Sequence, residues 1–163
     1  MANSAPDFYK ILQTLAEHEV DFIVVGGICA VLHGAPVSTF DLDIVHSRAP
    51  ENIQHLISAL DQMDACYRGR GEQRLVPDSY HLVSTGHHLL MTTYGPLDVL
   101  GTIGSDHGYD GLYDHSEELI VGDLQIRLLD LASLIKVKEE TARAKDQVVI
   151  PILRQTLKEK QKL

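Results

Sequence analysis

Two acidic residues inside an apolar run are the feature of this sequence that most limits its fold. Asp41 and Asp43 stand one residue apart in TFDLDIV, residues 39–45, which otherwise reads as a buried strand. Side chains alternate along a strand, so both aspartates are expected on one face, with Leu42 and Ile44 on the other. The sequence therefore predicts a strand that is apolar on one face and presents two carboxylates on the other.

Two neighbouring carboxylates need a reason to lie together. Close carboxylates repel each other, and partial burial raises the free-energy cost of keeping both ionised. A divalent cation removes this cost, and Mg²⁺ prefers hard oxygen ligands such as carboxylates, water and phosphate oxygens. The sequence thus favours a metal site at Asp41 and Asp43. The alternative is a strand end that carries two solvated aspartates.

Asp98 is a candidate for a third carboxylate at the same site. It lies in PLDVLG, residues 96–101, at the start of an apolar strand that follows a tight turn. If that strand neighbours the strand of Asp41 and Asp43, three carboxylates converge on one open face. Such a cluster can hold two metal ions about 4 Å apart for phosphoryl or nucleotidyl transfer. Taken alone, an aspartate in this place is commonly a turn residue.

A pair of glycines, Gly26 and Gly27, ends the apolar run DFIVV. Glycines between a strand and a helix let the backbone close tightly on a ligand, and the start of the helix offers free N–H groups to an anion. A phosphate bound there would lie near the aspartates of the next strand. By itself a Gly-Gly pair usually marks only a tight connection. Beside the paired aspartates, it indicates a phosphate site.

These motifs together resemble the signature of the DNA polymerase β-like nucleotidyltransferase superfamily. The matching parts are the glycine pair, a spacer of 13 residues and an Asp-x-Asp between apolar residues. Asp98 matches the third carboxylate that the family places on a following strand. Ser38-Thr39 and the later segment LDLASLIKVKEETARAKD, residues 129–146, are similar to the small bacterial and archaeal branch that includes abortive-infection toxins.

The resemblance implies a fold, a reaction and roles for individual residues. The fold would be α/β (α+β), a nucleotidyltransferase-like mixed β-sheet with helices packed mainly on one face, in a single domain over residues 1–163. The implied reaction moves a nucleoside monophosphate from a nucleoside triphosphate, expected to be ATP, to an acceptor hydroxyl on a tRNA, a protein or a small molecule. The cofactor would be Mg²⁺, or Mn²⁺ in its place. The implied catalytic and metal-binding residues are Asp41, Asp43 and Asp98, and the implied nucleotide-binding residues are Gly26, Gly27, Ser38, Thr39 and Lys136.

One position departs from the family pattern. Many small relatives have an arginine two residues before the position of Thr39, where this chain has Val37. An arginine of the glycine-rich loop RGRGEQR, residues 68–74, or Lys136 would then have to meet the phosphates. The departure keeps open a non-catalytic nucleotide-binding or toxin–antitoxin partner module of the same fold. A small metal-dependent phosphohydrolase is a third alternative.

Apolar spacing and turn residues predict the order of elements along the chain. Helices are expected over residues 6–18, 27–33, 50–63 and 130–137, with a helical tail from about Val148. Strands are expected over 21–25 and 39–45, and HLLMTTYGPLDVLGTI and ELIVGDLQIRLL are expected to form hairpins. These hairpins rule out a purely parallel sheet. Residues 68–74 and 104–114 are expected to be irregular.

Composition is that of an ordinary globular protein and disfavours several functions. The formal net charge of −9 argues against the broad basic face that tight, non-specific nucleic-acid binding needs. Cys29 and Cys66 show no metal spacing and no disulfide framework, which favours reduced thiols in a cytoplasmic protein. No apolar run is long enough to span a bilayer, so no membrane partner is expected. The histidines include no His-x-x-x-His pair, which disfavours a histidine metal site. The oligomeric state is not predicted.

Overall fold

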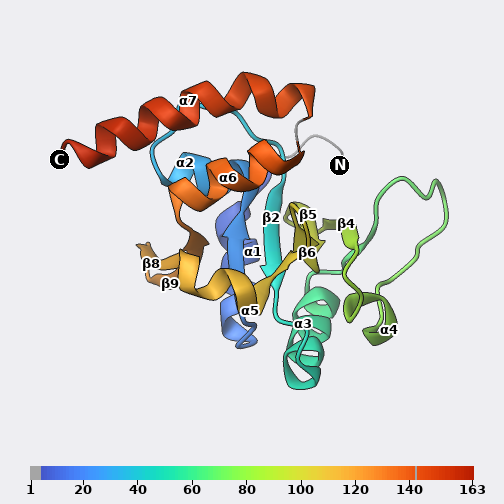
Figure 1. The fold of residues 1–163 in the computed structure, drawn as a ribbon. Coiled ribbons are helices and arrows are strands. Elements are labelled where there is room, and N and C mark those ends of the chain that lie inside the picture. Colours follow the sequence, from blue (N-terminus) through green and yellow to red (C-terminus); the bar gives the residue numbers. More distant parts are fainter. Residues whose placement is uncertain (1–4, 142) are drawn as a thin grey trace.

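The fold is built on a mixed, seven-stranded β-sheet (Figure 1). The computed structural model describes residues 5–141 and 143–163. The strand order is β3-β4-β5-β2-β1-β9-β8, and β6 pairs with β7 in a separate two-stranded sheet. The strands are β1 (Phe22–Val25), β2 (Leu42–His46), β3 (Cys66–Tyr67), β4 (His87–Thr92), β5 (Gly95–Leu100), β6 (Thr102–Ile103), β7 (His107–Gly108), β8 (Ser116–Val121) and β9 (Leu124–Leu129).

The sheet combines antiparallel hairpins with two parallel pairings. β4 pairs with β5 and β8 pairs with β9 in antiparallel fashion, which confirms both predicted hairpins. β2 runs parallel to β5, and β1 runs parallel to β9, so the chain crosses over between these pairs. The predicted fold class, a mixed sheet with helices, is confirmed. β2 begins at Leu42, so Asp41 directly precedes the strand that was predicted to contain it.

The helices begin where local sequence signals place them. Asp7 accepts a hydrogen bond from the backbone N–H of Lys10 at the start of the first helix, and Pro50 occupies the first turn of the third. Asp130 accepts from the N–H of Ser133, as expected of a cap. The helices are α1 (Phe8–Glu17), α2 (Gly26–Leu32), α3 (Pro50–Gln62), α4 (Ser79–Leu82), α5 (Tyr109–Leu112), α6 (Leu131–Thr141) and α7 (Ala144–Gln161), with a 3₁₀ turn η1 (Tyr113–His115).

Three differences from the sequence predictions concern element boundaries. The segment 129–146, which resembles one helix of the family, contains α6 and the first turn of α7. α7 begins at Ala144, earlier than the predicted Val148. The segment 104–114, predicted to be irregular, contains the short elements β7 and α5. In none of the described helices is there an apolar stretch of the length that a bilayer crossing requires.

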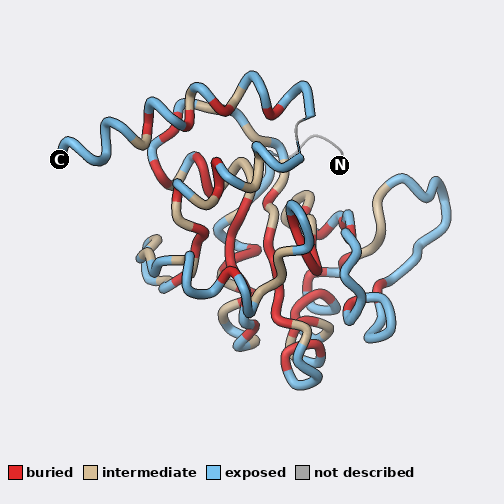
Figure 2. The backbone as a smooth tube through the Cα atoms, viewed as in Figure 1, coloured by how far each residue is buried: buried red, intermediate tan, exposed pale blue. Residues whose placement is uncertain are grey.

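One face of the sheet is covered and the other is left partly open. Along β4, exposed and buried residues alternate, with Leu90 buried and Leu89 exposed. Leu90 is paired with Leu97 of β5, which is paired with Leu42 of β2, and all three are buried. These residues share the covered face, because paired residues of neighbouring strands point the same way. Figure 2 shows the buried stretches following the central strands.

Different helices pack near the two ends of β2, at whose start the predicted aspartates lie. His46, at the end of β2, donates through Nε2 to the carbonyl of Leu82 in α4, at 2.7 Å, and α4 packs on α3. At the other end, α7 runs across α6, and α6 packs on α2 (Figure 1). Cys29 of α2 and His33, which directly follows α2, both donate to the carbonyl of Leu129 at the end of β9. These contacts fix α2 and α6 beside the start of β2.

Candidate active site

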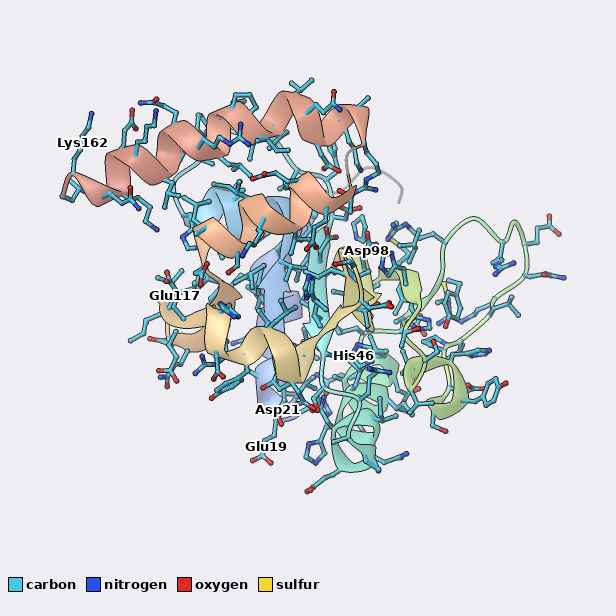
Figure 3. All side chains as sticks on the ribbon, viewed as in Figure 1. Glu19, Asp21, His46, Asp98, Glu117 and Lys162 are labelled. Atoms are coloured by element: carbon cyan, nitrogen blue, oxygen red, sulfur yellow. The ribbon has the colours of Figure 1, made fainter. Side chains whose placement is uncertain are left out.

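Three aspartates converge on the open face of the sheet, where β2 and β5 run side by side. Asp43 of β2 and Asp98 of β5 are Cα partners in the parallel pairing, so their side chains point the same way. Asp41 precedes β2, and one carboxylate oxygen from each of the three residues lies within 4.8 Å of the other two. Figure 3 shows Asp98 on the side of the molecule where α6 lies, away from His46. The structure thus brings together the three carboxylates that the sequence singled out.

The charges of these aspartates oppose one another. Burial, and then the neighbouring charges of Asp98 and Asp41, raise the pKa of Asp43 from 3.8 to about 8. Burial and Asp98 also raise the pKa of Asp41, although Arg68 acts in the opposite direction. The Oδ1 atom of Asp43 is buried and has no hydrogen-bond partner among the described residues. A buried carboxylate oxygen without a donor, beside two further carboxylates, fits a divalent cation.

The two glycines bring the backbone close to this cluster. Gly26 has a φ of +69°, and a Cβ atom there would overlap the carboxylate of Asp43. A Cβ at Gly27 would lie 2.5 Å from Oγ1 of Thr39. Both positions therefore require glycine, the first for its backbone conformation and both for space. α2 begins at Gly26, directly beside Asp43 and one residue earlier than the sequence predicted.

Thr39 and Ser38 lie on the approach to the first aspartate. The hydroxyl of Thr39 donates to the backbone carbonyl of Asp41 at 3.1 Å, and the same side chain packs against Gly27. Thr39 therefore links the glycine turn to the start of β2. Ser38 is exposed one residue earlier. The structure thus places the Ser38-Thr39 pair at the edge of the site.

Arg68 reaches the carboxylates from the far side of β5. It directly follows β3, and its Nη2 lies 2.7 Å from Oδ1 of Asp98 and 3.8 Å from Oδ2 of Asp41. Its Nη1 donates to the carbonyl of Leu90 at 2.6 Å. The sequence had marked the loop of residues 68–74 as a phosphate clamp or a solvated segment. It gave no sign that Arg68 pairs with Asp98, since no local spacing encodes that contact.

Lys138 and Lys145 are lysines whose charges act on the aspartates, Lys145 by lowering the pKa of Asp41, while the predicted Lys136 lies elsewhere. Lys136 lines a cavity of about 680 Å³ between α5 and α6, and none of the three aspartates lines this cavity. Lys138 is among the groups whose charge lowers the pKa of Asp43. Residues two apart on a helix are separated by about 200° around its axis, so they face different surroundings. The structure does not bring Lys136 to the triad.

Asp146 of α7 holds Lys138 in place. Its carboxylate is buried and lies 3.5 Å from Nζ of Lys138, with further bonds from Oγ1 of Thr141 at 2.8 Å and Nε of Arg143 at 3.1 Å. Burial alone would raise the pKa of Asp146, but the bonds from Thr141 and Arg143 and the nearby charges lower it. The carboxylate therefore stays ionised and joins α6 to α7.

Known proteins resemble this chain in their structure but not in their sequence. No family model and no curated protein sequence matches the chain. The fold matches that of a lincosamide antibiotic adenylyltransferase, LnuA, bound to lincomycin, with a TM-score of 0.63 and 16% identity over 91% of this chain and 95% of that one. The chain has the nucleotidyltransferase fold.

Two further nucleotidyltransferase structures agree with this assignment. A protein from Thermotoga maritima, TM1012, described as a putative nucleotidyltransferase, gives a TM-score of 0.59 at 16% identity, covering 93% of this chain and 91% of that one. The solution structure of the antibiotic-resistance factor ANT(2″)-Ia gives 0.60 at 13% identity, covering 92% and 82%. At such identities the likeness establishes the nucleotidyltransferase fold alone. The fold by itself does not establish which reaction this chain catalyses.

Within the nucleotidyltransferase fold, the residues chosen from sequence fall into two groups. The larger group gathers around the triad, and Lys136 lies apart in the cavity between α5 and α6. Arg68, Lys138 and Lys145 are cations whose charges act on the triad and whose positions sequence reasoning left open. The residues that gather around the triad are Asp41, Asp43, Asp98, Gly26, Gly27, Ser38 and Thr39.

Proposed function

We propose that this protein is a metal-dependent nucleotidyltransferase that moves a nucleoside monophosphate from a nucleoside triphosphate, with ATP as donor, to an acceptor hydroxyl. The observation that supports this most is the convergence of Asp41, Asp43 and Asp98 within 4.8 Å on an open face of the sheet. The fold it shares with adenylyltransferases supports the same reaction. In a cluster of solvated aspartates, water would hydrogen-bond each carboxylate oxygen. The Oδ1 atom of Asp43 is instead buried and has no donor among the described residues, as expected of an oxygen that binds a cation.

The donor set suits Mg²⁺, or Mn²⁺ in its place. Asp41 and Asp43 would hold the cation, and Asp98 would complete the oxygen set. When bound, such an ion supplies charge neutralisation for the triphosphate and for the oxygens between which the phosphoryl group moves. The raised pKa of Asp43 means that binding the cation would also release a proton from this carboxyl group.

The protein residues around the triad would bind and orient the nucleotide. Gly26 and Gly27 stand at the start of α2 close to Asp43, and their backbone N–H groups would donate to a phosphate that approaches there. Thr39 and the exposed Ser38 add hydroxyl groups at the edge of the same space. Lys138, held by Asp146, contributes a positive charge toward the triphosphate.

The acceptor that we propose is a small molecule with a free hydroxyl group. LnuA is described with lincomycin and ANT(2″)-Ia with adenylyl-2″-tobramycin, so proteins of this fold modify small antibiotics. The net charge of −9 disfavours a long nucleic acid as acceptor.

A non-catalytic nucleotide-binding module is a second candidate function. The observation that favours it is the ion pair between Arg68 and Asp98, which occupies the proposed metal site. Val37, where many small relatives have an arginine, points the same way. Such a module would bind nucleotide and gain thermal stability from it without transferring any group.

Labelled nucleotides separate these functions. The purified protein is incubated with Mg²⁺, ATP labelled at the α-phosphate, and a panel of hydroxylated small molecules, tRNA and protein fractions. A nucleotidyltransferase attaches label to one acceptor class and releases pyrophosphate, and the Asp43→Asn variant does not. Nucleotide-dependent thermal stabilisation without labelling of any acceptor would support the binding module. Release of nucleoside monophosphate or inorganic phosphate without labelling would instead indicate a phosphohydrolase.

A further inference from the structure

We propose that Arg68 is a built-in counter-ion of the aspartate triad, which the metal ion and the triphosphate together displace, so that metal binding and nucleotide binding become coupled. This inference rests on the proposed function and concerns the same site. Arg68 then has two alternative partners. In the free protein it pairs with the carboxylates of the triad, and in the protein with bound metal and nucleotide it pairs with the phosphates.

The contacts of Arg68 show that it already fills the place of a cation. Its guanidinium lies 2.7 Å from Oδ1 of Asp98 and 3.8 Å from Oδ2 of Asp41, two of the three carboxylates. The side chain of Asp98 is 13% exposed, so this pair lies in a partly desolvated setting. A positive group placed there partly offsets the repulsion within the triad.

A metal ion and Arg68 cannot both use the same oxygens of the triad. A divalent cation bound to Asp98 would stand a few ångströms from the guanidinium, and like charges at about 4 Å repel strongly when water is partly excluded. One of the two positive groups must therefore leave. The cation would have to compete with Arg68 for Asp98, which lowers the affinity of the free protein for metal.

The triphosphate provides the second partner for the displaced guanidinium. Arginine binds phosphate through parallel N–H donors, as it binds carboxylate. When Arg68 moves from Asp98 to a phosphate, its guanidinium therefore exchanges one set of hydrogen bonds for another. The nucleotide and the metal would thus each favour the binding of the other. The chain has Val37 where many small relatives have an arginine, and Arg68 can supply the missing positive charge.

The backbone around Arg68 allows its side chain to move without unfolding the sheet. The N–H of Arg68 donates to the carbonyl of Leu89 at 2.9 Å, which ties its backbone to β4. Residues 69–78, which follow, form neither helix nor strand, and Gly69 and Gly71 both have positive φ. The side chain is 25% exposed and can rotate about this fixed point away from Asp98 while its backbone stays in place.

Binding of Mn²⁺, followed by the loss of its free-ion electron paramagnetic resonance signal, tests the inference without any catalytic readout. The titration is made on wild-type protein and on Arg68→Gln, each with and without a non-hydrolysable ATP analogue. Arg74→Gln is the matched control, because Arg74 lies in the same loop and pairs with Asp64 outside the triad. Melting curves establish that each variant is folded.

We expect Arg68→Gln to bind Mn²⁺ about tenfold more tightly than wild type in the absence of nucleotide, because a competing charge is removed. The gain in Mn²⁺ affinity that the nucleotide analogue produces should be smaller in this variant than in wild type. Arg74→Gln should match wild type in both respects. If Arg68→Gln folds poorly, Arg68→Lys serves instead. A lysine keeps the charge but lacks the two-nitrogen fork by which Arg68 meets Leu90 and Asp98, so its Mn²⁺ affinity should lie between the other two.

Two results would overturn the inference, and they are distinguishable. If wild type binds Mn²⁺, Asp43→Asn does not, and the Arg68 variants bind it no more tightly than wild type, the role of Arg68 is wrong and the proposed function stands. If neither wild type nor the Arg68 variants bind Mn²⁺ with or without the analogue, both the role of Arg68 and the metal-dependent function are wrong.

Discussion

Asp43 of β2 and Asp98 of β5 are direct partners in a parallel strand pairing. Their carboxylates point the same way because the backbone register of two central strands fixes them, and no loop has to fold to bring them together. Gly26, at the end of the neighbouring strand β1, adds a backbone that approaches Asp43 closely. The site is therefore preorganised by the sheet, and each prediction below changes one part of it.

Asp43→Asn and Asp98→Asn should each lower the rate of nucleotidyl transfer by about 100-fold or more, because a preorganised charge in the site is lost. The rate is measured as label transferred from ATP to acceptor, or as pyrophosphate released. Asp61→Asn is the control, because Asp61 is an exposed aspartate of α3 outside the triad. Equal rates for Asp98→Asn and Asp61→Asn would contradict a catalytic role for Asp98.

The stability of the metal-free protein should fall as the pH rises toward 8, because Asp43 has a pKa of about 8 in the folded protein and 3.8 as its ordinary value. Between these values the folded protein holds a proton that the unfolded chain has released, so raising the pH favours unfolding. Asp43→Asn has no ionisable group at this position, so its stability should rise relative to that of wild type as the pH is raised over the same range.

Melting temperatures of wild type and Asp43→Asn in a chelator, from about pH 5 to about pH 8, check this prediction. His88, whose pKa burial lowers to about 4, adds an opposite dependence that is common to both proteins and cancels in the difference. Added Mg²⁺ should restore wild-type stability near pH 8. A difference between the two proteins that does not change with pH would show that Asp43 is ionised throughout.

Gly26→Ala should abolish metal binding, whereas Gly34→Ala should only destabilise the protein. Both glycines have positive φ, so alanine costs about 1–2 kcal/mol of stability at either position. Only at Gly26 would the new Cβ overlap Asp43, while nothing lies within 4 Å of it at Gly34. Mn²⁺ titrations and melting curves of both variants separate the two effects. Retention of wild-type Mn²⁺ affinity in Gly26→Ala would argue against the close packing of this turn on Asp43.

Asp146→Asn should destabilise the protein by about 3 kcal/mol, because it leaves the largely buried Lys138 without its carboxylate. Glu139→Gln breaks another pair between α6 and α7, with Arg154 at 3.5 Å, and should cost less than about 1 kcal/mol because both side chains are about half exposed. Denaturant unfolding of both variants measures the difference. Similar losses in the two variants would mean that Asp146 has no special part in holding the helices together.

The Asp-x-Asp pair and the starts of several elements could be predicted from sequence because their signals are local, whereas the pairing of β2 with β5 that brings Asp98 to them joins distant segments and was expected only from the family resemblance. The Asp-x-Asp spacing places Asp41 and Asp43 on one side of the chain, and the turn before Asp98 starts a hairpin strand. Pro50 marks the start of α3 by its fixed backbone conformation, and Asp130 marks the start of α6 by accepting a hydrogen bond from the N–H of Ser133. Such signals depend on neighbours in the chain, so the sequence alone contains them.

Other parts of the site depend on contacts between distant segments. Arg68 meets Asp98 across 30 residues of chain, and nothing in the glycine-rich loop specifies that partner. Lys136 and Lys138 both fit the polar pattern of α6, and only the packing of α6 against α2 and α7 decides which of them pairs with Asp146 and whose charge acts on Asp43. The buried Asp146 of α7 accepts hydrogen bonds from Lys138 and Thr141 of α6 and so fixes the two helices together. The apolar periodicity of the sequence does not reveal such polar contacts.

A crystal structure with Mn²⁺ and a non-hydrolysable ATP analogue tests the central claim most directly, because the anomalous signal locates the metal independently of the nucleotide. The account predicts an Mn²⁺ peak bound by Asp41 and Asp43, with Asp98 facing it and the triphosphate lying against Gly26. Nucleotide bound elsewhere, with Arg68 still on Asp98 and no Mn²⁺ between the three carboxylates, would contradict it.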